Sequence, residues 1–466
     1  MQYIENKTID EIAVGDSAKL TRTLRHQDIE LFAVLSGDVN PAHVDEEFAK
    51  ADMFHKVIAH GMWGGALVSA LLGTELPGPG TIYLNQSFSF RRPVGLGDTV
   101  TVRVTVKEVD RLKKRVRLDC ECRNQADEAV IVGEAEVIAP TEKVRRPRAL
   151  LPEVHLHERG LRYRQFVAAT QGLQPIRTAV VHPCDEPSLG GALEAMRAGL
   201  IVPVLVGPKA KISAAAAALK ASLDGLEIVD APHSHAAADS AVAMAREARV
   251  EAVMKGALHT EEIMSAAVKA DTGLRTERCM SHAFVFDVPH YPKPLVITDA
   301  AVNIYPTLTD KRDIIQNAID LAHALGVGQP KVAILSAVET IDPKITSTLE
   351  AAALCKMAER GQISGGVLDG PLAFDNAISH EAAATKHIVS SVAGDADILV
   401  APDLEAANML AKQLIYLAGA DSAGVILGAR VPIILTSRAD GELARLASCA
   451  IARLLVRHHT WGNYDQ

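Results

Sequence analysis

The chain has 466 residues, which is too long for a single hydrophobic core, so we expect two or three domains. Its hydrophobic content of 48% and charged content of 23% are ordinary for a soluble globular protein. The net charge of −9 argues against bulk electrostatic attraction to nucleic acid or to an anionic membrane, so we expect neither as a partner.

Residues 1–142 are predicted to form one domain of helices and antiparallel strands. After a polar entry segment at 8–20, helical patterns cover 23–35 and 44–51, and a wholly apolar helix with no polar face is expected over 61–72. Segments that alternate apolar and polar residues follow at 81–91, 99–110, 115–123 and 129–138. Four such strands joined by short turns predict a sheet curled around a buried helix, which is an α+β hot-dog architecture.

Two motifs of this domain carry groups suited to chemistry on a carbonyl compound. The sequence SGDVNPAH at 36–43 places Asp38 and His43 five residues apart across a turn, and HGM at 60–62 opens the apolar helix on Gly61. A neutral histidine accepts a proton near neutral pH, a carboxylate orients its partner, and a helix N-terminal amide stabilises a negative oxygen. An Asp-turn-His pattern is also a common helix cap, and that alternative stays open at this point.

These motifs, in this order, resemble those of the MaoC-type (R)-specific enoyl-CoA hydratases. Two further segments belong to the resemblance, YLNQSFSFRRP at 83–93 and GDTV at 97–100. The resemblance implies that Asp38 and His43 activate the water that adds to a short trans-2-enoyl thioester, giving the (R)-3-hydroxyacyl product. The family's oxyanion amide falls on Gly61. Its active-site serine falls on Ser69, which is also explained as a small residue that permits close packing. We expect Asn40 to orient Asp38 through a side-chain hydrogen bond.

A basic, proline-containing linker is predicted at 143–160, where the sequence changes from valine-rich strands to alanine-rich helices. Beyond it, short apolar runs alternate with helical stretches, which predicts an α/β fold with mainly parallel sheets. The expected strands lie at 178–181, 202–206, 252–254, 295–298, 332–335, 366–368, 398–400 and 431–436. The expected helices lie at 188–199, 211–223, 235–248, 310–325, 343–360 and 405–418.

Several motifs of this second half resemble the phosphate acetyl/butyryltransferases. They are MKGALHT at 254–260, TERCMSH at 276–282, LVITDAA at 295–301, VLDGPLAFD at 367–375, SVAGDAD at 391–397, APDLEAAN at 401–408 and TSR at 436–438. The resemblance implies a two-subdomain phosphotransacylase fold over 161–466, with subdomain I at about 161–290 plus 437–466 and subdomain II at about 291–436. The active site would lie in the cleft between them, and the butyryl branch looks closer than the acetyl branch.

The resemblance places a serine–arginine pair on Ser437 and Arg438. An arginine can hold phosphate near the thioester, and a hydroxyl can stabilise the leaving thiolate. The same residues also look like a capping box at a helix start. Four further residues are expected to bind substrate in the cleft: His259, His282, Asp403 and Asn408. The stretch at 260–267 lacks the arginine of the acetyl enzymes, and the family's Asn-Ala-Gly-Asn is replaced at 405–408.

We therefore expect a bifunctional enzyme of coenzyme A thioesters, with acyl-CoA and inorganic phosphate as substrates and no bound cofactor or metal. An alternative is an active hydratase whose second half is a non-catalytic assembly or ligand-sensing module. A weaker alternative is a metal- and NAD-dependent decarboxylating dehydrogenase, but the sequence shows no clustered carboxylates that could bind its metal.

The six cysteines show no metal-ligand spacing, and the start of the chain shows no signal peptide, so a cytoplasmic location with reduced thiols is expected. Hot-dog domains usually pair, so we expect at least a homodimer.

Overall fold

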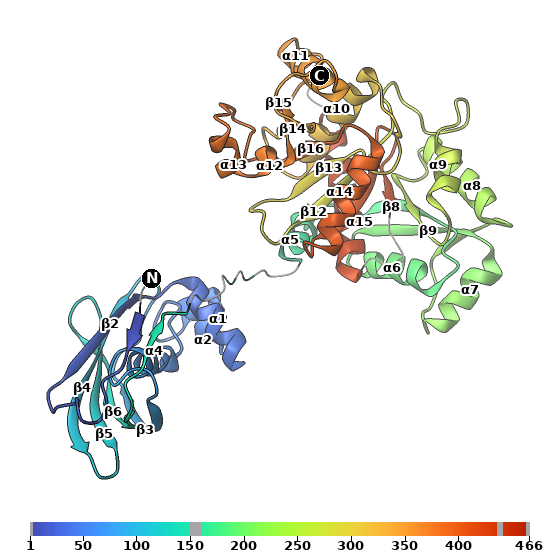
Figure 1. Ribbon diagram of the computed structural model, residues 1–466. Coiled ribbons are helices and arrows are strands. Elements are labelled where there is room, and N and C mark those ends of the chain that lie inside the picture. The colour runs from blue at the N-terminus through green and yellow to red at the C-terminus, as the bar shows by residue number, and fades with distance from the viewer. Residues whose placement is uncertain (1–2, 150–153, 155, 157–159, 436–440, 463–466) are drawn as a thin grey trace. The chain divides into compact units, whose positions relative to one another are not determined.

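A computed structural model of the chain describes residues 3–149, 154, 156, 160–435 and 441–462 (Figure 1). The chain divides into two compact units, residues 1–156 and 157–466. Within the described part of the chain, no helix is both long and apolar enough to cross a lipid bilayer.

The first unit is built on a five-stranded antiparallel sheet (Figure 1). Its strands, in spatial order, are β2 (Ser17–Thr23), β4 (Thr99–Asp110), β5 (Arg115–Arg123), β6 (Ala129–Ile138) and β3 (Ile82–Phe90). Alternate residues of β4 and β5 are buried, which gives the sheet one apolar face. The four strands predicted from the period-two pattern are confirmed within one residue at each end.

Helices α1 (His26–Ser36), α2 (Pro41–Val44), α3 (Glu46–Ala51) and α4 (Gly61–Thr74) complete this unit. α4 packs its large apolar side chains, among them Trp63, Leu67 and Leu71, against the apolar face of the sheet. Its other face carries small residues and is exposed, including Ser69. The prediction of a wholly buried helix is therefore wrong for that face, although the hot-dog arrangement of helix and sheet is confirmed.

Two pairings in the first unit were not predicted. Part of the expected polar entry segment forms β2, an edge strand whose inward side chains Ala18 and Leu20 pack on the core. β1 (Tyr3–Glu5) pairs antiparallel with β7 (Arg145–Pro147), and the guanidinium of Arg145 lies 4.7 Å from the centre of the Tyr3 ring. The unit therefore extends past the predicted boundary at residue 142, because the first stretch of the expected linker is held to the amino terminus.

The second unit is built on one 11-stranded mixed sheet (Figure 1). One side consists of parallel strands, in the order β10 (Glu227–Asp230), β9 (Ile201–Gly207), β8 (Ile176–Val181), β11 (Ala252–Lys255) and β18 (Ile433–Leu435). The other side is also parallel, with β13 (Leu295–Thr298), β16 (Ile398–Val400), β14 (Lys331–Leu335) and β15 (Val367–Leu372). The predicted mainly parallel α/β fold is confirmed.

Two antiparallel strands, β17 (Asp421–Leu427) and β12 (Ser281–Asp287), join the two groups. The pairings β18–β17, β17–β12 and β12–β13 are all antiparallel, so the second parallel group runs opposite to the first. The carboxyl ends of the two groups therefore lie at opposite edges of the sheet. Residues that the sequence suggested for one cleft therefore follow strands whose carboxyl ends lie at opposite edges of the sheet.

The helices described for the second unit are α5 (Leu161–Ala169), α6 (Glu186–Arg197), α7 (Lys209–Ala218), α8 (Ser234–Arg246), α9 (Thr260–Ala267), α10 (Leu308–Ala324), α11 (Thr346–Glu359), α12 (Phe374–Ile378), α13 (His380–Thr385), α14 (Leu404–Tyr416) and α15 (Glu442–Gly462). The predicted helical stretches correspond to α6, α7, α8, α10, α11 and α14, and the other helices were not among them. Alanine residues fill the contacts of α8 with the sheet, where small side chains allow helix and strands to approach closely.

Candidate functional site

The loop between α1 and α2 carries Asp38 and is held by local capping interactions. α1 ends at Ser36 and is capped by Gly37, whose φ of 75° allows its N–H to donate to the Ala33 carbonyl. One carboxylate oxygen of Asp38 accepts a hydrogen bond of 3.2 Å from the backbone N–H of Asn40. The Asn40 side chain instead accepts from the N–H of Ala42 and caps α2. The expected side-chain bond from Asn40 to Asp38 is thus replaced by a backbone bond.

His43 is half-buried on α2, and its ring is oriented by the backbone. Nδ1 lies 2.9 Å from the carbonyl oxygen of Ile58. Because a carbonyl oxygen can only accept, Nδ1 carries the proton and the lone pair remains on Nε2. His43 therefore has the tautomer that a general base requires.

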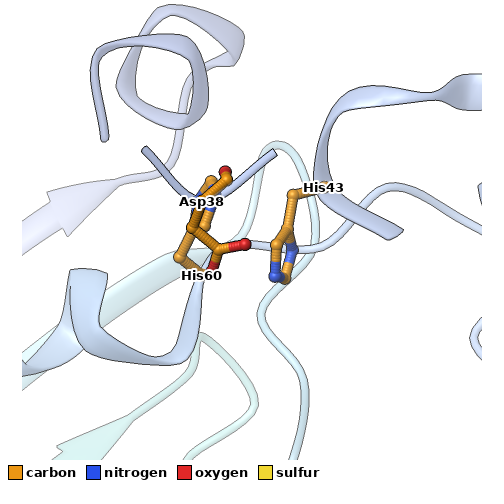
Figure 2. A group of neighbouring side chains, drawn as sticks. All are labelled: Asp38, His43 and His60. Carbon is orange, nitrogen blue, oxygen red and sulfur yellow. The ribbon is translucent and has the colours of Figure 1, made fainter. Parts of the chain in front are cut away.

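His60 lies beside both residues, as Figure 2 shows. It is 3% exposed, its Nε2 lies 3.0 Å from the backbone carbonyl oxygen of Asp38, and its ring centre is 4.0 Å from that of His43. One side-chain atom from each of the three residues lies within 4.8 Å of the others. In the sequence, His60 stands out only as part of the HGM motif, and no role was predicted for it. Its position directly before Gly61 was the available signal.

Gly61 is the first residue of α4, and His60 is its N-cap. Amides in the first turn of a helix lack an intrahelical acceptor, so the Gly61 N–H is free to bind an anionic oxygen. A Cβ atom at position 61 would lie 3.1 Å from the Phe90 ring, which explains a glycine at this close approach. Ser69 lies two turns further along, on the exposed face of α4, so the structure does not bring it to this group.

A pocket of about 280 Å³ opens beside these residues. Its lining is mainly aromatic and aliphatic, and it includes His43, His60, Gly61 and two arginines. The other lining residues are Phe54, Ile58, Ala59, Trp63, Gly64, Phe90, Arg91, Arg92, Pro93, Val94, Val100, Val130 and Ile131. A small apolar pocket next to a base and a helix N-terminus suits a short acyl chain attached to a polar carbonyl group.

The group formed by Asp38, His43 and His60 could also act as a metal ligand set. Two imidazoles and a carboxylate are a common donor set for zinc. The same spacing suits a water molecule, because two hydrogen bonds of about 2.8 Å to one water separate their partners by about 4.6 Å. The expectation that the chain binds no metal stays a prediction.

The candidates of the second unit fall into two groups. Asp403 caps α14 by accepting a hydrogen bond of 2.8 Å from the N–H of Ala406, and Asn408 on the same helix donates to the Ala300 carbonyl at 3.1 Å. These residues lie at the carboxyl ends of β13 and β16. His259 is exposed and caps α9, directly after β11, at the other edge of the sheet. Ser437 and Arg438 follow β18 in the sequence and lie outside the described residues.

Comparison with known proteins identifies both units. A family model described as phosphate acetyl/butaryl transferase matches residues 235–452, and one described as MaoC like domain matches residues 11–128. The chain is 63% identical over 293 residues to a phosphate acetyltransferase from Rhizobium meliloti, spanning 63% of this chain and 93% of that protein. The chain belongs to the phosphate acetyltransferase family. In addition, it carries a MaoC-like hot-dog domain ahead of the phosphate acetyltransferase region.

Two further comparisons place the chain within this family. It is 38% identical over 294 residues to a phosphate butyryltransferase from Clostridium acetobutylicum, covering 63% of this chain and 98% of that protein. The crystal structure of a branched-chain phosphotransacylase from Enterococcus faecalis V583 matches with a TM-score of 0.53 and 28% identity, over 61% of this chain and all of that one. The expectation that the butyryl branch is closer is wrong, since the acetyltransferase is the more similar of these two enzymes.

His282 does not have the position expected of a cleft residue in this family. It lies on β12 in the interior of the sheet, is 1% exposed, and its ring centre is 4.3 Å from that of Phe284. Burial lowers the pKa of His282 to about 3, and its Nδ1 has no hydrogen-bond partner in the described part of the chain. The placement corresponds to a neutral packing residue and not to a substrate ligand.

Asp299 was not singled out from the sequence, although it directly follows β13. It is 4% exposed, and its carboxylate accepts hydrogen bonds from the N–H groups of Ala301, Val302 and Asn303. Burial raises the pKa of Asp299, against the opposite effect of these hydrogen bonds. Asp299 therefore fixes the turn whose Ala300 carbonyl receives Asn408, at the carboxyl edge of the second parallel group.

Proposed function

We propose that the second unit transfers an acetyl group between coenzyme A and inorganic phosphate. The observation that carries this proposal is the 63% identity to a phosphate acetyltransferase over 93% of that protein's length. In the proposed reaction, a phosphate oxygen attacks the thioester carbonyl carbon and the carbon–sulfur bond breaks. Arg438 would hold the phosphate, and the Ser437 hydroxyl would donate a hydrogen bond to the leaving thiolate. His259, Asp403 and Asn408 remain proposed substrate contacts.

We propose that the first unit hydrates a short trans-2-enoyl-CoA to the (R)-3-hydroxyacyl-CoA. The MaoC-like family match and the grouping of Asp38, His43 and the Gly61 amide beside an apolar pocket support this proposal. Nε2 of His43 would take a proton from water while the water oxygen bonds to the β-carbon. The resulting enolate oxygen would accept a hydrogen bond from the Gly61 N–H, and the proton taken up by His43 would then be delivered to the α-carbon, which restores the neutral imidazole.

The size of the pocket supports a short acyl group. A cavity of about 280 Å³ is at the lower end of the range of ligand pockets, and aromatic side chains such as Phe90 and Trp63 line it.

We propose that neither reaction needs a bound cofactor. We further propose a cytoplasmic homodimer or larger homo-oligomer, since the edge strand β3 exposes the apolar side chains of Ile82, Leu84 and Phe90.

The hydratase is tested by following loss of the conjugated double bond of crotonyl-CoA with the full chain. Asp38→Asn should lower kcat by roughly 10²-fold to 10⁴-fold, because it removes a charged partner of the acid–base pair. Asp127→Asn, an exposed substitution on the β5–β6 hairpin, is the matched control and should leave kcat unchanged. Coupling the product to dehydrogenases specific for (R)- or (S)-3-hydroxyacyl-CoA determines the configuration. Equal rates in wild type and Asp38→Asn would contradict the proposal.

The transferase is tested by release of free thiol from acetyl-CoA with and without phosphate. We expect release only with phosphate, and its loss in Arg438→Ala, because phosphate then has no bidentate cation. Arg360→Ala, an exposed position at the end of α11, should behave as wild type. No release from acetyl-CoA, with hydration of crotonyl-CoA intact, would favour the alternative in which the second unit is a non-catalytic module.

A further inference from the structure

His60 contacts both members of the proposed acid–base pair and precedes the proposed oxyanion amide. It comes from the loop before α4, whereas Asp38 and His43 come from the segment between α1 and α3. The Nε2 contact to the Asp38 carbonyl joins residues 22 positions apart. The other hydrogen bonds described for the Asp38 loop run to residues within a few positions along the chain. His60 therefore connects the Asp38 loop to the start of α4, and the contact of His43 with the Ile58 carbonyl connects the neighbouring α2 to the same segment.

The second contact of His60 is with the ring of His43. The two ring centres are 4.0 Å apart at an interplanar angle of 37°, and the Phe32 ring lies 4.9 Å from His60. The Ile58 carbonyl fixes Nδ1 of His43 from the backbone side. A hydrogen bond at one ring atom still allows the ring to tilt about it, and the packed neighbour restricts that tilt. The direction of the Nε2 lone pair thus depends on His60.

Stability alone does not account for a histidine at this position. Because Nε2 faces a carbonyl oxygen, it carries the proton, and Nδ1 is left as a buried acceptor without a hydrogen-bond partner among the described residues. An unpaired buried polar atom is unfavourable, and an apolar ring of similar shape would remove it. Asp38 is exposed, so water could replace the lost donor at its carbonyl oxygen.

We propose that His60 is a positioning residue, which holds the Asp38 loop by its Nε2–H and the His43 ring by packing. The inference rests on the proposed hydratase activity of the first unit. It assigns His60 no contact with the reacting atoms. Its effect is to keep the carboxylate, the base and the Gly61 amide in one arrangement, and displacements of about 1 Å in such groups can lower a rate by about 10²-fold.

Two substitutions separate the contacts. His60→Phe keeps a packed ring but removes the donor to Asp38, whereas His60→Gln keeps an N–H donor but removes the ring. The matched controls are His26→Phe and His26→Gln, since His26 is an exposed histidine of the same unit whose described contact is with Glu30. Hydration of crotonyl-CoA by the full chain and the thermal unfolding of the first unit are measured for all four variants and for wild type.

We expect kcat to fall by roughly 10-fold to 10²-fold in both His60 variants, with KM within about threefold of wild type, because only one of the residues that line the pocket changes. The unfolding temperature of His60→Phe should equal or exceed that of wild type, since the unpaired Nδ1 is gone. Loss of activity without loss of stability is the signature of positioning. The His26 variants should match wild type in kcat and KM.

Two results would overturn the inference. One is a kcat within about twofold of wild type in both His60 variants. The other is a fall of kcat that runs parallel to a fall of the unfolding temperature, or failure of both variants to fold, which would make His60 a structural residue. If wild type itself does not hydrate crotonyl-CoA or longer enoyl-CoA substrates, the proposed function fails first, and the inference fails with it. The wild-type assay therefore distinguishes the two failures.

Discussion

The two units assemble their candidate sites in different ways. In the first unit, Asp38, His43, His60 and Gly61 come from 24 consecutive positions and meet within one loop–helix segment. In the second unit, the candidates run in the sequence from His259 to Arg438. His259, Asp403 and Asn408 lie after two different strands of one mixed sheet, and His282 lies on a third strand. A site formed within a short segment can be recognised from spacing and residue type. A site distributed over strand ends depends on pairings between distant segments, which spacing does not encode.

This difference predicts that damage to one sheet will not reach the other site. Gly133 on β6 lies opposite Phe88, and a Cβ atom there would be 1.8 Å from the backbone oxygen of Ser87. Because backbone atoms of β3 must move, Gly133→Ala should destabilise the first unit by about 3 kcal/mol or more. Thermal unfolding monitored in the full chain should show an earlier transition with lower hydratase activity, while phosphate-dependent thiol release at 25 °C persists.

Gly73→Ala is the control for this substitution, since a Cβ atom at that exposed helix position meets nothing within 4 Å. Alanine is a better helix former than glycine, so this variant should be at least as stable as wild type. If Gly133→Ala abolished both activities while the second unit stayed folded, the two sites would depend on each other and the units would not be independent.

The local features of the fold were predictable because they depend on short-range patterns. The strands of the first unit follow a period of two, and the Asn40-Pro41 turn and Gly37 helix end use residues that favour those conformations. The motifs that resemble the MaoC-type hydratases and the phosphate acetyl/butyryltransferases then indicated the fold class of each unit. Asp38 and His43 could be proposed from the sequence for the same reason, since both belong to one turn.

The strand pairings that sequence reasoning missed need contacts between distant segments. β1 and β7 pair across most of the first unit, and β12 and β17 pair with each other in the middle of the second sheet, although about 140 residues separate them in each case. The expected β–α repeats predict strands that all run in one direction, so they do not indicate the reversal of direction that β12 and β17 produce. The role of His60 was missed for a similar reason, because its contacts with Asp38 and His43 exist only after α4 packs beside the loop.

The buried histidine of the second unit, His282, allows a pH test of whether the two units respond independently. The pKa of His282 is lowered by burial to about 3, from an ordinary value of 6.5. Between these values the unfolded chain binds a proton that the folded chain does not, so stability falls as pH falls through this window. The contribution is about 1.4 kcal/mol per pH unit. Denaturant unfolding of the second unit at pH 6.5 to 5, in wild type and His282→Phe, measures it.

We expect a steeper loss of stability with acid in wild type than in His282→Phe, and we expect the transition of the first unit to be the same in both proteins. Equal slopes for the second unit would mean that His282 can take up a proton in the folded sheet. The choice of phenylalanine keeps an aromatic ring next to Phe284 and removes both nitrogen atoms, including the unpaired Nδ1. The variant therefore isolates titration from loss of packing.

The smallest expected effect concerns Arg91, an exposed residue in the lining of the first unit's pocket. Its neighbour Arg92 has its guanidinium 3.3 Å from the Glu128 carboxylate, whereas Arg91 makes no ion pair with any described residue. An unpaired cation beside the pocket can attract the phosphates of a coenzyme A thioester. Because exposed charge pairs contribute at most about 1 kcal/mol, Arg91→Ala should raise KM for crotonyl-CoA by roughly twofold to fivefold and leave kcat unchanged.

The difference in KM between wild type and Arg91→Ala should shrink at high salt, which screens exposed charges. Arg92→Ala provides the comparison in which an existing ion pair is broken. A larger fall in kcat than rise in KM would assign Arg91 to the catalytic arrangement, and the catalytic residues of the first unit would then extend beyond the loop–helix segment to the residue that follows β3.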